Sequence, residues 1–155
     1  MKRLLYVTAA LLLFSSVAAA QEHNQNRIHI AFASSDYELN KGVNIGAQRA
    51  IYRYDKVKVE AAAEATTYFY EGRRIHTLQA GPQVSVDLFE AKLTLGARAF
   101  FGASKDGHYY DYSHLAGVFA DVNVTEHFFI RGAQDRQTFG SGVGYRTTVG
   151  FGYSF

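Results

Sequence analysis

The chain has 155 residues, among them 14 glycines, 12 Phe and 11 Tyr, but a single proline, no cysteine and no tryptophan. This length fits one domain of ordinary size. Without cysteine the chain has no disulfide, no thiol nucleophile and no Cys-ligated zinc site. Its formal net charge of +2 argues against a nucleic-acid partner, because nucleic-acid binding needs a basic surplus that neutralises phosphates.

The first residues have the layout of a secretory signal peptide. Two basic residues precede an apolar run over 4–14, and small residues lead from there to Ala20. We expect cleavage after Ala20, which makes 1–20 the signal peptide and 21–155 the mature domain. A membrane anchor is the alternative, but no positive charge follows the run to stop transfer. No later segment approaches the ~20 apolar residues of a spanning helix, so a membrane role would require strands.

Apolar and polar residues alternate over most of the remaining chain, most clearly at its end. One face of the last segment carries Tyr145, Thr147, Val149, Phe151, Tyr153 and Phe155. A period of two is typical of a strand, here one with an aromatic face. We predict strands at 27–34, 42–52, 57–69, 75–86, 92–102, 113–122, 128–136 and 143–155. Each is close to the ~9–11 residues that cross a bilayer at a tilt.

The predicted connections between these strands alternate in length. The short ones are 53–56, 87–91 and 123–127. The others are longer on average, and they are 35–41, 70–74, 103–112 and 137–142, of which 103–112 is the longest. This alternation is typical of an up-and-down membrane barrel with periplasmic turns at one end and extracellular loops at the other. An even number of strands also brings both ends of the barrel chain to the periplasmic side.

The orientation of the polar face distinguishes a membrane barrel from a soluble one. A secreted lipocalin-like barrel would bury the apolar face, and it stays an alternative. The polar face here combines charges of both signs with glycines that leave room for them, so a paired interior network is feasible. We predict that this network contains Glu60, Glu64, Arg98, Asp121, Arg131 and Arg146. Because eight strands enclose a lumen only as wide as side chains, such residues and Phe100 should close it.

Two arginines test the assignment of faces. The register implied by a weak internal repeat would aim Arg131 at lipid beside Phe129. Since a mid-bilayer arginine costs about 2–4 kcal/mol, we shift that register by one residue and turn Phe128 and Ile130 outward. Arg49 continues an outward series, but it lies near the periplasmic end, where the cost falls to about 0–1 kcal/mol.

The chain resembles the small OmpA/OmpX-type outer-membrane barrels in its signal peptide, its eight alternating strands and three segments, 78–82, 93–102 and 151–155. This resemblance implies an all-β, eight-stranded antiparallel up-and-down transmembrane barrel in the outer membrane of a Gram-negative-type bacterium. It also implies partners, namely outer-membrane lipid, lipopolysaccharide and the barrel-assembly machinery. That machinery would read an assembly signal carried by Val149, Phe151, Tyr153 and Phe155.

Catalytic and metal-binding residues are hard to assemble from this sequence. Ser113 and His114 are adjacent on a predicted strand and point to opposite faces, which separates a nucleophile from its base. His108, Asp111 and His114 are candidates for a metal at the rim, but such residues in an aromatic loop are more often solvated. We therefore expect no catalysis, metal or cofactor, with a lipid A-modifying enzyme and a narrow channel as alternatives.

The segment 107–112 is the best candidate for a surface contact. His108, Tyr109, Tyr110 and Tyr112 offer a large side-chain area at low entropy cost, which suits binding of a sugar or a partner protein. Their simpler role is in the aromatic girdle where strands meet lipid headgroups. The sequence thus predicts a structural or surface-interaction barrel without identifying an extracellular ligand.

Overall fold

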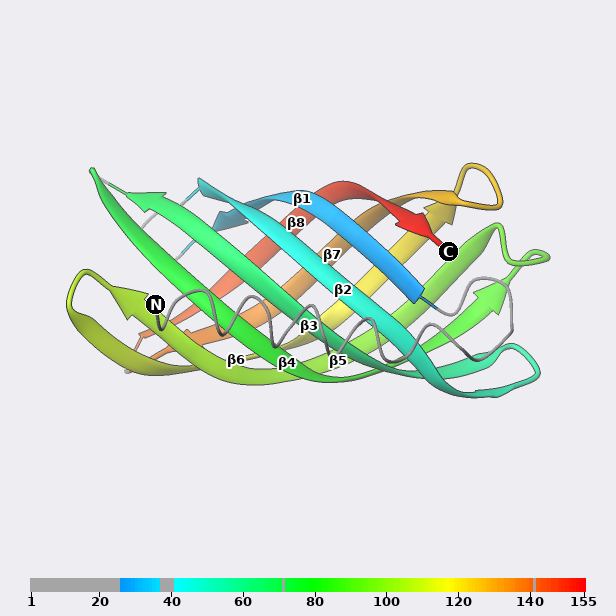
Figure 1. The fold of residues 1–155 in the computed structure, drawn as a ribbon, viewed down its shortest axis with the longest axis horizontal. Helices are drawn as coiled ribbons and strands as arrows, with labels where there is room; N and C mark the ends of the chain where they lie inside the picture. Colours follow the sequence, from blue (N-terminus) through cyan, green and yellow to red (C-terminus); the bar gives the residue numbers. More distant parts are fainter. Residues whose placement is uncertain (1–25, 37–40, 71, 141) are drawn as a thin grey trace, which may run out of the picture.

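The computed structural model describes residues 26–36, 41–70, 72–140 and 142–155, so the predicted signal peptide lies outside the described residues. Eight strands form one antiparallel sheet that closes on itself (Figure 1). They are β1 (Asn26–Ser35), β2 (Lys41–Tyr54), β3 (Val57–Tyr70), β4 (Arg73–Leu88), β5 (Leu93–Asp106), β6 (Tyr109–Asn123), β7 (Phe128–Phe139) and β8 (Gly142–Ser154). The predicted eight-stranded up-and-down barrel is confirmed.

The sheet closes where the first strand meets the last. Ile30 of β1 is the cross-strand partner of Ile45 in β2 and of Phe151 in β8. Closure leaves no unpaired strand edge, so the backbone polar groups find their partners within the sheet. β1 begins and β8 ends at one end of the barrel, which we call the proximal end. The opposite, distal end carries the β3–β4, β5–β6 and β7–β8 turns and lies on the left in Figure 1.

The distal turns are shorter than the sequence predicts. The prediction of a long loop over 103–112 is wrong. β5 continues to Asp106 and β6 begins at Tyr109, so Gly107 and His108 alone connect them. Gly107 has a φ of 56°, a left-handed conformation that permits a two-residue hairpin turn without steric cost. The β3–β4 and β7–β8 turns also contain a glycine with positive φ. These three distal connections are therefore tight turns, and the predicted difference in length from the proximal connections is not seen in them.

Side chains alternate between the lumen and the outer wall along each strand. In β1, His29 and Ala31 are buried, whereas Ile28, Ile30 and Phe32 are between 41% and 56% exposed. In β7, Phe128 and Ile130 are half-exposed while Arg131 is buried, as the shifted register predicts. Apolar side chains therefore form the outer wall, and polar and small residues line the lumen together with a few large rings.

Large side chains inside the lumen lie against glycines of neighbouring strands. The ring of Phe129 fills the space beside Gly152, and the ring of Phe119 fills the space beside Gly96. A Cβ atom at either glycine would overlap the ring. Because the interior of a small barrel packs by matching large residues with small ones, these glycines make room for the interior side chains.

This packing makes Gly152 sensitive to a single added methyl group. We expect Gly152→Ala to lower the free energy of unfolding by about 1–3 kcal/mol, because the methyl would overlap the Phe129 ring and the Ile28 carbonyl oxygen. Gly132→Ala is the matched control, since no described atom beyond Gly132 and its two chain neighbours lies within 4 Å of a Cβ there. Urea unfolding of the refolded barrel, followed by gel mobility, measures both. Equal losses in the two variants would contradict this account.

Candidate functional site

Among the described residues, the lumen holds four arginines and four carboxylates whose side chains are at most 5% exposed. They are Arg27, Arg98, Arg131, Arg146, Glu60, Glu64, Asp121 and Asp135. Their formal charges cancel. A net charge of zero does not by itself make their burial favourable, because charges removed from water also need close partners and hydrogen bonds.

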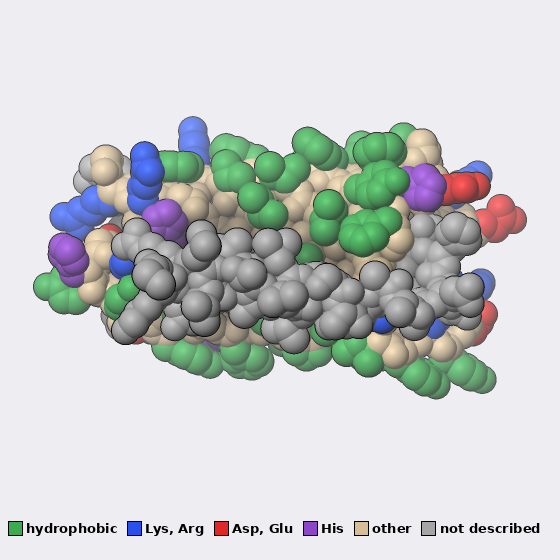
Figure 2. Space-filling model, in the orientation of Figure 1, with side chains coloured by type: hydrophobic (Ala, Val, Ile, Leu, Met, Phe, Trp, Pro, Cys, Tyr) green, Lys and Arg blue, Asp and Glu red, His purple; other side chains and the backbone are tan. Residues whose placement is uncertain are grey.

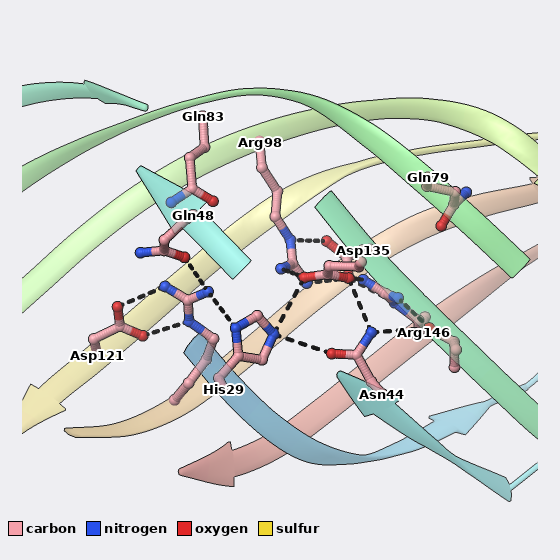
Figure 3. Close-up of polar contacts among 12 residues, drawn as sticks. His29, Asn44, Gln48, Gln79, Gln83, Arg98, Asp121, Asp135 and Arg146 are labelled. Carbon is pink, nitrogen blue, oxygen red and sulfur yellow. Dashed lines mark hydrogen bonds and ion pairs between the residues drawn. The ribbon is translucent and has the colours of Figure 1, made fainter. Parts of the chain in front are cut away.

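One cluster joins Arg98 and Arg146 to Glu64 and Asp135. Figure 3 labels the two arginines and Asp135. Arg98 donates from Nε to Asp135 Oδ1 over 2.8 Å and from Nη2 to Oδ2 over 2.7 Å, a bidentate pair. It also donates from Nη1 to Glu64. Arg146 donates from Nη2 to Glu64 Oε2 and to Asp135 Oδ2, each over 2.8 Å. This four-residue cluster therefore connects β3, β5, β7 and β8 across the lumen.

A second cluster is built around Asp121. Arg131 donates from Nε and Nη2 to the two oxygens of Asp121, each over 2.7 Å, and Arg27 donates from Nη1 over 2.8 Å. Arg131 also donates from Nη1 to Gln48 Oε1 over 2.7 Å, and the Gln48 amide donates to Glu60 over 3.3 Å. Gln48 thus links the guanidinium of Arg131 to a carboxylate that it does not touch directly.

His29 and Asn44 lie between the two clusters (Figure 3). His29 Nε2 is 3.0 Å from Asn44 Oδ1 and 3.5 Å from Glu64 Oε1, and His29 Nδ1 is 3.4 Å from Arg131 Nη1. Asn44 donates from Nδ2 to Glu64 Oε2 over 3.1 Å. The polar network therefore extends from one cluster to the other, and β1 and β2 take part in it.

Large side chains occupy the lumen on either side of these polar contacts. Phe100 follows Arg98 on the inward face of β5 and is fully buried. Tyr68 is buried as well and donates its hydroxyl to Gln137 over 2.7 Å. The Phe129 ring lies under Arg27, whose Cζ is 3.8 Å from the ring centroid. The barrel interior is thus a packed, ion-paired core.

All six residues predicted for the interior network lie in the lumen, where each contacts at least one other member of the polar network. Arg27, Asp135 and His29 are not among the residues predicted from the sequence. The alternation of side chains along each strand could have identified them, because each shares an inward face with other interior residues. Asp135 shares the inward face of β7 with Arg131, and Arg27 and His29 share the inward face of β1.

The residues predicted to carry the assembly signal line the outer wall towards the proximal end. Their side chains are between 37% and 64% exposed, and they are Val149, Phe151, Tyr153 and Phe155. The Tyr153 ring meets Phe128 edge-on at 5.1 Å between centroids. It stacks on His127 at 5.5 Å and on Phe155 at 6.3 Å. These rings form an aromatic cluster at the proximal rim, of the kind that suits a membrane interface.

The residues predicted for a surface contact lie at the distal end, but three of them belong to a strand. His108 is in the β5–β6 turn, whereas Tyr109, Tyr110 and Tyr112 are in β6 and are between 56% and 83% exposed. Ser113 is buried, so the adjacent Tyr112 and, two residues earlier, Tyr110 share the outward face of β6. They extend the wall of the barrel rather than a flexible tip.

Ser113 and His114 lie on opposite sides of the barrel wall. Ser113 is buried and accepts a hydrogen bond from Gln79 Nε2 over 2.8 Å. His114 packs beside Tyr112 on the outer side, with 5.5 Å between ring centroids. Within the described part of the chain, no three His, Cys, Asp or Glu side chains are grouped so that they could hold a metal ion. The candidate set of His108, Asp111 and His114 is therefore not assembled.

A closed eight-stranded antiparallel sheet with paired charges inside and an apolar wall outside defines the fold class of the transmembrane β-barrels. Among the described residues, no helix is both long and apolar enough for a membrane span. No protein-family model matches the sequence, and no curated protein matches it either.

Several solved structures share this fold. The attachment invasion locus protein Ail of Yersinia pestis is 17% identical, with a TM-score of 0.59 over 86% of this chain and 100% of that one. Neisserial surface protein A is 16% identical, with a TM-score of 0.59 over 83% of this chain and 94% of that one. The outer membrane enzyme PagL is 7% identical, with a TM-score of 0.54 over 83% and 98%. At such identities the likeness shows the fold, and the fold supports more than one function.

Because of the four-residue cluster, we expect the stability of the barrel to depend on Glu64 and on Asp135. Glu64→Gln would leave Arg98 and Arg146 sharing one carboxylate, and we expect the free energy of unfolding to fall by about 3–5 kcal/mol. Glu90→Gln is the control, because Glu90 is exposed in the β4–β5 turn and should change it by no more than about 0.5 kcal/mol. Chemical unfolding in one detergent compares them. A loss in Glu64→Gln no greater than in the control would refute a stabilising role for the cluster.

Proposed function

We propose that the protein is an integral outer-membrane barrel with a structural or surface-interaction role and no catalytic activity. The observation that carries this proposal is the inverted distribution of side chains. Paired charges fill the lumen, and large apolar side chains cover the outside. In water such a wall would be an apolar surface far larger than soluble monomers expose, whereas in a bilayer it faces hydrocarbon.

The apolar wall lies between two more polar ends. Figure 2 shows hydrophobic side chains along the middle of the visible face, with Lys, Arg, Asp, Glu and His side chains gathered towards both ends. Representative members of this wall from seven strands are between 41% and 67% exposed, and Phe69 of β3 is 51% exposed. They include Ile28, Ile30, Ile45, Leu78, Val84, Phe101, Val118, Ile130 and Val149. This band with polar flanks matches the layers of a membrane, a hydrocarbon core between two headgroup regions.

Two arguments favour a non-catalytic role over the other barrel functions. Ser113 and His114 are separated by the wall, so they do not form a nucleophile and its base. Side chains such as Arg98, Arg146 and Phe100 occupy the lumen, which disfavours a channel. Ail and Neisserial surface protein A, described as an attachment invasion locus protein and a surface protein, share the fold. We infer a comparable exposure at the cell surface for this barrel.

Membrane location is tested by fractionation of cells that express the full chain. We expect the protein in the outer-membrane fraction, extracted only by detergent, with different gel mobility in boiled and unboiled samples because the closed barrel resists detergent until heated. A chain with a soluble lipocalin-like fold would instead appear in the periplasm or the medium. Recovery as a water-soluble protein without detergent would overturn the proposal.

A further part of the proposal is that the barrel-assembly machinery reads the aromatic face of β8 at its proximal end. We expect Tyr153→Ser combined with Phe155→Ser to reduce the assembled, heat-modifiable barrel in cells several-fold. The matched control is Val143→Ser with Tyr145→Ser, two exposed residues on the same outward face at the distal end of β8. Refolding both purified variants in detergent separates assembly from stability. Equal reduction in cells by the two pairs would contradict a signal at the proximal end.

A further inference from the structure

The distal end of the barrel carries a hollow lined by basic side chains. It lies between the start of β4 and the β5–β6 turn and has a volume of about 560 Å³. Its basic members are Arg73, Arg74, His76, Lys105 and His108, and Asp106, Gly107 and Tyr109 complete the lining. Among the described residues of this lining, three permanent cations therefore meet one carboxylate, whereas the charges of the lumen cancel.

Strand register places three of these residues on the outer side of the wall. Thr77 and Ser104 are buried in the lumen, so their neighbours His76 and Lys105 point outward, and Arg74 shares the face of His76. His76 and Lys105 are direct cross-strand partners. We call Arg74, His76 and Lys105 the outward basic cluster.

The outward basic cluster begins where the apolar wall ends. Leu78, the next outward residue of β4 on the proximal side of His76, is 67% exposed. On β5, Phe101 occupies the same outward face below Lys105 and is 56% exposed. In the proposed membrane orientation, the cluster therefore lies at the level of the lipid headgroups in the outer leaflet.

Aromatic rings accompany the two permanent cations of this cluster. The Arg74 Cζ atom is 5.9 Å from the centroid of Phe69, its cross-strand partner in β3. Lys105 Nζ is 5.1 Å from the centroid of Tyr110, its partner in β6. Such neighbours hold the stems of the cations against the wall and leave their hydrogen-bond donors for a ligand.

The cations of the hollow differ from the lumen arginines in their ion pairing. Within the described ranges, Arg73, Arg74 and Lys105 take part in none of the ion pairs, whereas all four lumen arginines do. A guanidinium and an ammonium close together are suited to phosphate, which accepts hydrogen bonds from both. Among the described residues, an anion from outside the barrel is the partner that this charge balance favours.

We propose that the outward basic cluster, with Arg73 at its edge, binds the phosphate groups of phosphorylated saccharide headgroups in the surrounding outer leaflet, that is, of lipopolysaccharide. This inference rests on the proposed membrane location. The cluster faces sideways from the wall at headgroup level, which favours a lipid-anchored phosphate over a soluble anionic glycan that approaches the distal end from outside.

The test uses the refolded full barrel in phosphatidylcholine vesicles that contain a small fraction of lipopolysaccharide, either intact or dephosphorylated. Lipid retained on the barrel after purification is the readout. The native barrel should retain intact lipopolysaccharide at least several-fold more than the dephosphorylated form. Arg74→Gln with Lys105→Gln should reduce that retention by about thirtyfold, since each of the two basic residues near an anionic surface contributes on the order of 1 kcal/mol.

The matched control is Lys56→Gln with Lys92→Gln, which removes the same charge from exposed turns at the proximal end and should leave retention unchanged. Equal retention of the two lipids by the native barrel, or equal effects of the two double variants, would overturn the inference. So would a soluble sulfated glycan that displaces the lipid completely at equal concentration. Gel mobility of unheated samples reports insertion independently, so a native barrel that fails to insert refutes the proposed membrane location itself.

Discussion

Pairing of buried charges is the constraint on which the rest of this barrel depends. Eight strands leave a lumen only as wide as side chains, and here ionic groups occupy much of it. Removing each ion from water costs several kcal/mol, which only close partners can offset. Glu64 and Asp135 each contact both Arg98 and Arg146, so every charge in that cluster has two partners of opposite sign. A neutral, hydrogen-bonded interior in turn allows the outer wall to be apolar.

The distal rim follows the opposite rule. Inside the lumen the arginines pair with carboxylates of the chain. In the distal hollow, by contrast, Asp106 is the one carboxylate that the described residues of the lining set against Arg73, Arg74 and Lys105. The lumen therefore holds the fold together, and the rim offers charge to its surroundings. Basic residues thus stabilise the fold within the lumen, whereas at the distal rim they are suited to binding an anionic ligand.

Much of the fold follows from local patterns, and the exceptions have identifiable causes. The inward placement of Arg131 is predictable because burying an arginine in hydrocarbon costs free energy. This physical argument is stronger evidence for the register than a loose internal repeat. The extent of the β5–β6 hairpin is not predictable in the same way. Tyr-rich segments occur in loops and at strand ends alike, and only the left-handed Gly107 shows that the turn takes two residues. Asp135 lies on a predictable face, but nothing local shows that it is the centre of a cluster.

By itself, the sequence determined the period of the strands, their number and the residues that share each face, because alternation is a local property of an extended chain. Only the tertiary structure decided which charges meet. Arg98, Glu64 and Asp135 lie on strands that are not neighbours in the sheet, and they meet across the lumen. Such contacts depend on the register of every strand around the closed barrel, since a slip of one residue in any pair would turn a whole face from the lumen to the wall.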